Sequence, residues 1–342
     1  MIDEMLASPF PRKYSVQFVS AGGRESDPFY FDGLDSTGLG HTWQVVRADF
    51  DRMLVDNARR NGATVLTSTR LRPLGAAHDF STFELQPAGG FPRTVGCRVF
   101  IDATGQSALI GSRLKLKRTD PHLKNATIWT HFRGAHRDPG RDAGATVILH
   151  SDQKKSWFWY IPLPDDMVSV GCTGAVDYMC SADSPGAGAV FERELAACQA
   201  LTCRLSSAER VEPFRITKDF SYKCRPGAGQ GWVMVGDAYG FIDPVYSSGA
   251  CLALKSAEMA TDATHQALRT DDLSASQLGS WQTAYDTGVE NFQRLVYAFY
   301  DDDFNFGQFL ARHPEHRERL TDVLVGNVFK PDVARMFADI NS

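Results

Sequence analysis

The sequence has no run of about 20 apolar residues, so no membrane-spanning helix is expected. Its seven cysteines include no C-x-x-C pair and its nine histidines include no H-E-x-x-H, so neither a disulfide framework nor a metal site is predicted. The net charge of −5 and the lack of a long basic run disfavour nucleic-acid binding. Together with a start that lacks a secretion signal, these absences favour a cytoplasmic protein with reduced thiols.

The most informative feature of the sequence is a glycine-rich segment in its second half. It is the run GDAYGFIDPVYSSG from Gly236 to Gly249, which follows an apolar strand, Gly231–Val235, and precedes a long helical stretch. A strand, a tight turn and a helix start direct backbone N–H groups at an anionic or electron-rich ligand. Asp237 can accept hydrogen bonds from a polyol, and Ser248 and Gly249 can offer amides to a ring edge or a small anion. The alternative is a buried strand followed by a capped helix without a ligand.

A second segment, Ser156–Pro162 (SWFWYIP), is predicted to be a β-strand that ends at proline. Strands of alternating aromatic residues usually pack a core. Trp157 and Trp159 are two positions apart, so both indoles are expected on one face of the sheet. Two large rings on one face can also form the wall of a pocket.

Near the start of the chain, the segment Phe10–Phe18 places Lys13 five positions before Phe18. A lysine beside Arg12 is ordinarily a solvated surface charge. The alternative is a catalytic lysine, which must be shielded from bulk water, and burial favours the neutral amine.

Together the three segments resemble the flavin-dependent halogenases and related monooxygenases, which carry GDAxxFIDPxxSxG, W-x-W-x-I-P and a lysine five positions before a phenylalanine. The resemblance implies that the Gly236 to Gly249 run binds FAD and that Ser248 and Gly249 also hold a halide ion. It implies that the tryptophan strand separates the substrate from the flavin. In these enzymes the lysine lies at the end of a tunnel from the flavin and receives hypohalous acid.

Two further segments fit the same resemblance. Val99–Ser107 is an apolar strand that runs into Asp-Ala-Thr-Gly, in which Asp102 would brace the turn and Gly105 would let the backbone approach FAD. Arg47 opens a predicted helix and matches an arginine near the adenosine of FAD, although a surface cation is an equal alternative. The residues so assigned are Lys13, Trp157 and Trp159 for catalysis and Arg47, Asp102, Gly105, Gly236, Asp237, Pro244, Ser248 and Gly249 for the cofactor.

The pyrophosphate-binding fingerprint of such a fold, G-x-G-x-x-G between a strand and a helix, does not occur in the sequence. The glycine pairs at 22–23 and 89–90 have the wrong spacing. Lys13 stands too close to Met1 to leave room for the first βαβ unit of roughly 30 residues. We therefore expect the C-terminal majority of a halogenase-like flavoprotein, either a truncated gene model or a fragment, with weakened affinity for FAD.

The resemblance and the strand and helix patterns predict an α/β fold of the FAD-dependent monooxygenase and halogenase type. Its Rossmann-type FAD domain is expected to be incomplete. The predicted segments are a partial FAD domain with the first helix and the DATG strand (1–125), a β-rich substrate-binding lobe (126–225), the GDAxGFIDPxxSxG segment with its helix (226–270) and a helical C-terminal region (271–342).

The implied function is halogenation of an electron-rich aromatic ring with reduced FAD, O2 and halide. Tyr246 stands where tryptophan-type halogenases have a glutamate, so a phenol, a pyrrole or a carrier-bound ring is favoured over free tryptophan. No second dinucleotide fingerprint is visible, so a separate flavin reductase is expected as a partner. The alternatives are a flavin monooxygenase or reductase without halogenation, a non-catalytic binding protein, and a fragment that does not fold alone.

Overall fold

The computed structural model describes residues 1–32, 40–181, 186–301 and 303–340. Its largest sheet has eight strands, and β12, the strand with Trp157 and Trp159, lies in its interior between β11 and β13. All pairs in this sheet are antiparallel except β2 with β11. The strands are β2 (Ser15–Val19), β3 (Phe29–Tyr30), β10 (Asn125–Arg133), β11 (Thr146–His150), β12 (Ser156–Pro162), β13 (Met167–Ala175), β14 (Glu209–Arg210) and β15 (Arg215–Lys218).

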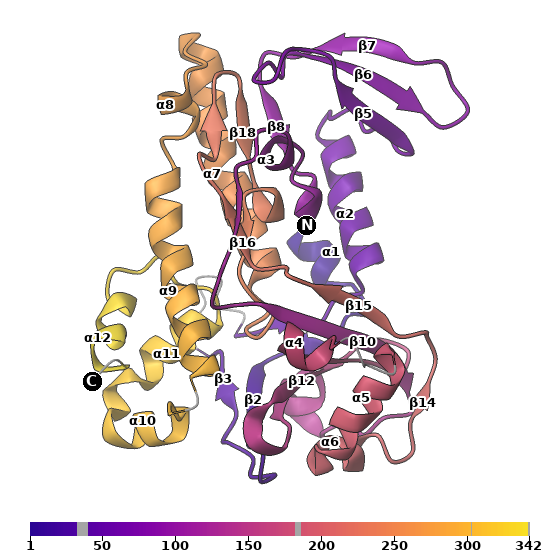
Figure 1. Ribbon diagram of the computed structural model, residues 1–342, viewed down its shortest axis with the longest axis vertical. Coiled ribbons are helices and arrows are strands. Elements are labelled where there is room, and N and C mark those ends of the chain that lie inside the picture. The colour runs from indigo at the N-terminus through magenta and orange to yellow at the C-terminus, as the bar shows by residue number, and fades with distance from the viewer. Residues whose placement is uncertain (33–39, 182–185, 302, 341–342) are drawn as a thin grey trace.

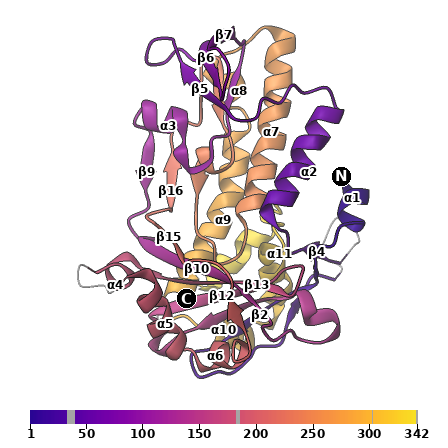
Figure 2. The same ribbon diagram turned by 90° about the vertical axis from the view of Figure 1, so that its right-hand side faces the viewer.

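The two faces of this sheet pack against different parts of the chain (Figure 2). One face, which includes Phe158 and Tyr160, packs on α5 (Ala187–Ala196) and α6 (Gln199–Arg204), with α4 (Val176–Met179) beside them. The other face carries Trp157 into the main core of the molecule. The alternation along β12 therefore divides its side chains between two hydrophobic cores, as the period of a strand requires.

The remainder of the chain is built around two long helices that stand side by side, α7 (Gly249–Thr270) and α9 (Gln282–Tyr300) (Figure 1). A three-stranded sheet places β18 parallel to β8, so the strand before the GDA turn lies next to the strand before the DATG turn. Its strands are β17 (Ala228–Gly229), β18 (Trp232–Met234) and β8 (Phe100–Asp102). A second small sheet contains β19 (Gly240–Phe241), β16 (Tyr222–Cys224) and β9 (Lys117–Thr119).

A third small sheet lies at the end of the molecule far from the large sheet and consists of β5 (Thr69–Pro73), β6 (Thr82–Pro87) and β7 (Arg93–Gly96) (Figure 1). The other elements of the first third of the chain are α1 (Ile2–Leu6), the pair β1 (Arg12–Lys13) and β4 (Thr42–Trp43), the 14-residue helix α2 (Arg47–Arg60) and the short helix α3 (Leu109–Arg113). The C-terminal helices besides α9 are α8 (Ala275–Leu278), α10 (Phe306–Arg312), α11 (Arg317–Leu324) and α12 (Met336–Ile340). Across the described residues, no helix is both long enough and apolar enough to cross a membrane.

Candidate active site

The turn after β18 forms the first part of the candidate site. Gly236 has a φ of +56°, a left-handed conformation that favours glycine. Its N–H donates to Ser256 Oγ on α7 at 2.8 Å, which holds the turn against that helix. Asp237 follows and is half-buried, and burial raises the pKa of its carboxyl while the charge of Arg47 opposes the shift. Its carboxylate accepts no hydrogen bond from the described part of the chain, so it is available to a ligand with hydroxyl groups.

The start of α7 lies at the same place. Gly236, Asp237, Ser248 and Gly249 line one small cavity. The first amides of a helix have no partner within the helix, and the side chain of Ser248 at the N-cap makes no capping hydrogen bond. The amides and the dipole of this 22-residue helix therefore favour an electron-rich or anionic group at its start. This acceptor and these donors fit the polyol chain and ring edge of FAD, and the sequence offers no G-x-G-x-x-G cradle for its phosphates.

The other predicted cofactor residues have different surroundings. Both oxygens of the fully buried Asp102 are occupied by the chain itself, since one accepts from the N–H and hydroxyl of Thr104 and the other from the N–H of Ile110 at 2.7 Å. Asp102 thus braces the turn before Gly105, whose φ is +62°. Arg47 is exposed and pairs with Asp51 at 3.1 Å, as expected for a surface cation. Its positive charge nevertheless acts to lower the pKa of Asp237. Their contacts with FAD stay predictions.

The two tryptophans of β12 lie on one face of the sheet, with ring centroids 6.2 Å apart. Trp157 is 2% exposed and donates its indole N–H to the hydroxyl of Tyr300 at 2.8 Å. Trp159 is half-buried and donates to Ser169 Oγ at 3.2 Å. Its ring lies over Gly171, where a Cβ would come within 2.2 Å of a ring carbon. Both rings are therefore fixed by a hydrogen bond as well as by packing.

Lys13 belongs to the short strand β1 and is half-buried. Its Nζ lies 5.8 Å from the centroid of Phe31, a residue of the main core. Within the described ranges Lys13 forms no ion pair, and burial lowers the pKa of its amine to about 8. Lys13 is thus partly shielded from water, and its catalytic role stays a prediction. No described hydrogen bond or ring contact joins Lys13 to the tryptophans or to the start of α7.

Asp243, to which the sequence assigned no role, connects the tryptophan strand with the turn before α7. Asp243, in the middle of the FIDP sequence, is 2% exposed and accepts hydrogen bonds from Val245, Asn125 and Tyr300. Tyr300 in turn accepts from Trp157. The aspartate lay inside a recognised motif, whereas Tyr300, at the end of α9, belongs to no motif and had no signal in the sequence.

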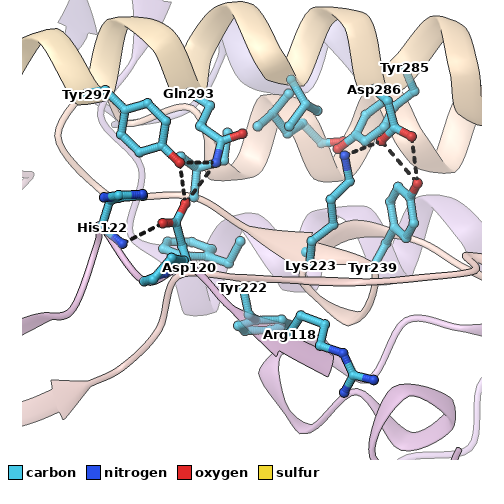
Figure 3. A pocket seen from close by; sticks show the side chains of 16 residues that line it. Arg118, Asp120, His122, Tyr222, Lys223, Tyr239, Tyr285, Asp286, Gln293 and Tyr297 are labelled. Atoms are coloured by element: carbon cyan, nitrogen blue, oxygen red, sulfur yellow. Dashed lines mark hydrogen bonds and ion pairs between the residues drawn. The ribbon is translucent and has the colours of Figure 1, made fainter. Parts of the chain in front are cut away.

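A larger cavity, of about 270 Å³, lies between α9 and the β16–β19 pair (Figure 3). At one end Asp120 accepts hydrogen bonds from Tyr297 and Gln293, and at the other Asp286 accepts from Tyr239 and pairs with Lys223. Its lining includes none of the site residues predicted from the sequence. It shares with the small cavity only the lining residues Gly240, Phe241, Ile242 and Leu252.

Comparison with known proteins identifies the class of protein. A family model described as tryptophan halogenase matches residues 31–325. The 1H-pyrrole-2-carbonyl-(peptidyl-carrier protein) chlorinase of Pseudomonas fluorescens is 24% identical over 96% of this chain and 77% of its own. The corresponding brominase of Pseudoalteromonas luteoviolacea is 28% identical over 96% of this chain and 79% of its own. The chain therefore belongs to the tryptophan halogenase family, as the sequence predicted.

Solved structures agree on the fold. The flavin-dependent brominase Bmp2 superposes with a TM-score of 0.86 at 23% identity, over 99% of this chain and 83% of that one. The myxobacterial chondrochloren halogenase CndH superposes with a TM-score of 0.79 at 25% identity, over 99% of this chain and 82% of that one. The predicted α/β fold of the FAD-dependent halogenase type, with a β-rich lobe, is confirmed. The four segment boundaries given above stay a prediction.

Proposed function

We propose that this protein is an FAD-dependent halogenase that acts on an electron-rich aromatic ring. The family match supports the enzyme class and the cofactor that the sequence predicted. The observation that carries the proposal is the position of Lys13, which has no ion-pair partner among the described residues and whose Nζ lies 5.8 Å from the ring of the core residue Phe31. Burial lowers the pKa of this amine to about 8. An amine with this pKa is partly neutral at the pH of a cell, and a neutral amine is nucleophilic toward an electrophilic halogen.

The residues of the chain divide the work. When bound, reduced FAD would give two electrons to O2 and the halide would give the other two, so that water and an electrophilic halogen at the level of hypohalous acid are formed. Asp237 and the start of α7 hold the cofactor, and the amides of Ser248 and Gly249 hold the halide. Trp157 and Trp159 keep the substrate from reaching the flavin. Lys13 receives the oxidised halogen and presents it to the ring, so that its contribution is one of position.

The substrate class follows from the position before the SxG turn. Tyr246 occupies it and is buried, and its hydroxyl donates to the carbonyl of Leu295 at 3.1 Å. Tyr246 therefore lacks the carboxylate that a glutamate at this position would offer to an amino-acid substrate, and its hydroxyl is already bound within the protein. We therefore propose a pyrrole, a phenol or a carrier-bound ring, and the two carrier-protein relatives favour a carrier-bound pyrrole among these. A separate reductase would supply reduced FAD in the cytoplasm.

The test replaces Lys13 by alanine in protein supplied with FAD, a flavin reductase and chloride or bromide. Substrate halogenation should fall at least about a hundredfold, the lower range for loss of one positioned catalytic group, while oxygen uptake and free hypohalous acid continue. Lys255→Ala is the matched control. The Nζ of Lys255 lies 5.9 Å from the ring centroid of Phe329, much as Lys13 lies near Phe31, but Lys255 pairs with Glu258 on α7. Unchanged halogenation in Lys13→Ala would refute the proposal, and oxygenated product without halide would favour the monooxygenase alternative.

A further inference from the structure

The carboxylate of Asp243 lies at the entry to the turn that leads into α7. Its Oδ1 accepts from the backbone N–H of Val245 at 3.0 Å, which closes the turn on itself. Its Oδ2 accepts from Asn125 Nδ2 at 3.2 Å and from the Tyr300 hydroxyl at 3.0 Å. Asn125 is the first residue of β10 and Tyr300 the last of α9, so one buried carboxylate joins the turn, the large sheet and the C-terminal helix.

The direction of the hydrogen bonds through Tyr300 is fixed. Burial and the neighbouring charge of Asp243 raise the pKa of Tyr300, so the phenol keeps its single hydrogen. An indole N–H only donates and a carboxylate only accepts. Trp157 therefore donates to Tyr300 at 2.8 Å, and Tyr300 donates to Asp243. Hydrogen bonds that end on a charge in a buried site are stronger than neutral ones and polarise one another.

We propose that Asp243 is a positioning residue. Through its hydrogen bond with Tyr300, it fixes the position of the Trp157 indole relative to the turn before Ser248 and Gly249. The wall between substrate and flavin and the start of α7 are then one hydrogen-bonded unit rather than two separately packed parts. This inference rests on the proposed function for its catalytic consequence. Loosening the unit should let the oxidised halogen escape, so that oxygen is consumed without a matching amount of halogenated product.

A purely structural role makes a different prediction. If the bonds only add stability, losing any buried tyrosine hydroxyl near β12 should have the same effect. Tyr160 is the matched control, because it lies on the same strand, is 1% exposed and donates its hydroxyl to the carbonyl of His136. It belongs to the opposite core, and no described hydrogen bond or ring contact joins it to Trp157 or Asp243. Tyr300→Phe and Tyr160→Phe each remove one hydroxyl and keep the ring.

The first measurement needs no catalysis. Protein with 15N-labelled tryptophan has six indole N–H groups, and the signal of Trp157 is the one lost in Trp157→Phe. Tyr300→Phe should move this signal upfield because the hydrogen bond is lost. Asp243→Asn should move it as well, although Asp243 does not contact Trp157, and Tyr160→Phe should leave it in place. A Trp157 signal unmoved by Tyr300→Phe or Asp243→Asn would overturn the proposed chain of bonds.

The second measurement compares halogenated product with oxygen consumed. Tyr300→Phe should lower this ratio several-fold while oxygen uptake is retained, and Tyr160→Phe should match the wild type. A moved indole signal with an unchanged product ratio would overturn the positioning role, as would an equal loss in both tyrosine variants. A wild type that makes no halogenated product would refute the proposed function and the catalytic consequence with it. The NMR comparison would then still decide whether the hydrogen bonds exist.

Discussion

Replacing Asp243 by asparagine should flatten the pH dependence of the free energy of unfolding. Burial raises the pKa of this carboxyl from 3.8 to about 6, against the opposing hydrogen bonds from Val245, Asn125 and Tyr300. The folded protein thus holds the proton more tightly than the unfolded chain. The resulting stabilisation is complete below about pH 4 and is lost as the pH rises through 6. At about 1.4 kcal/mol for each pKa unit, the effect is about 3 kcal/mol.

Urea unfolding of the wild type and of Asp243→Asn at pH values from 4 to 7 measures this effect. The wild type should lose about 2.5 kcal/mol more than the variant between pH 4 and 7, whatever the difference in their absolute stability. Asp272→Asn is the control, since hydrogen bonds from Ser274 lower the pKa of the exposed Asp272. Its small effect should have the opposite sign. Parallel stability curves for Asp243→Asn and the wild type would refute a raised pKa at this buried carboxyl.

Two further predictions test the cofactor turn and the tryptophan strand. Asp237→Ala should weaken FAD binding by about 1–3 kcal/mol in a flavin fluorescence titration, because ligand hydroxyls lose their acceptor. Asp56→Ala removes a half-buried carboxylate that pairs with Arg59 on α2, and this control should bind FAD as the wild type does. Equal affinities in all three proteins would contradict the assignment. Gly171→Ala should cost about 1–3 kcal/mol in chemical unfolding, because the new methyl displaces the ring of Trp159. Gly22→Ala, whose new methyl meets no atom within 4 Å, should leave the free energy of unfolding unchanged. An equal loss of stability in Gly171→Ala and Gly22→Ala would exclude the ring contact.

The parts of the site that depend on local sequence were predictable. The GDA turn needed only a strand, a glycine and a helix start, and the shared face of Trp157 and Trp159 followed from the period of a strand. The helical segment beneath the large sheet is divided into α5 and α6 at Cys198, which its sequence does not indicate. Cys198 has φ −127° and ψ 81°, and no glycine or proline marks this break.

The surroundings of the site residues could not be predicted, because they come from distant parts of the chain. Lys13 lies near Phe31, which is 18 positions further along the chain. The strand that carries Lys13 packs closely on Gly144, where a Cβ would lie 2.2 Å from the carbonyl oxygen of Arg12. Asp243 was visible within its motif, but its partner Tyr300 follows 57 positions later. Only the packing of α9 against the sheet brings the two together.

The position of β12 between two cores has a consequence for engineering this enzyme. Phe158 and Tyr160 contact only the core on the α5 and α6 side, while Trp157 belongs to the core on the other. Substitutions that improve packing beneath α5 and α6 should therefore raise thermostability without altering product selectivity. The α5–α6 side of the large sheet is thus the place to begin a directed-evolution library that seeks robustness before new substrates.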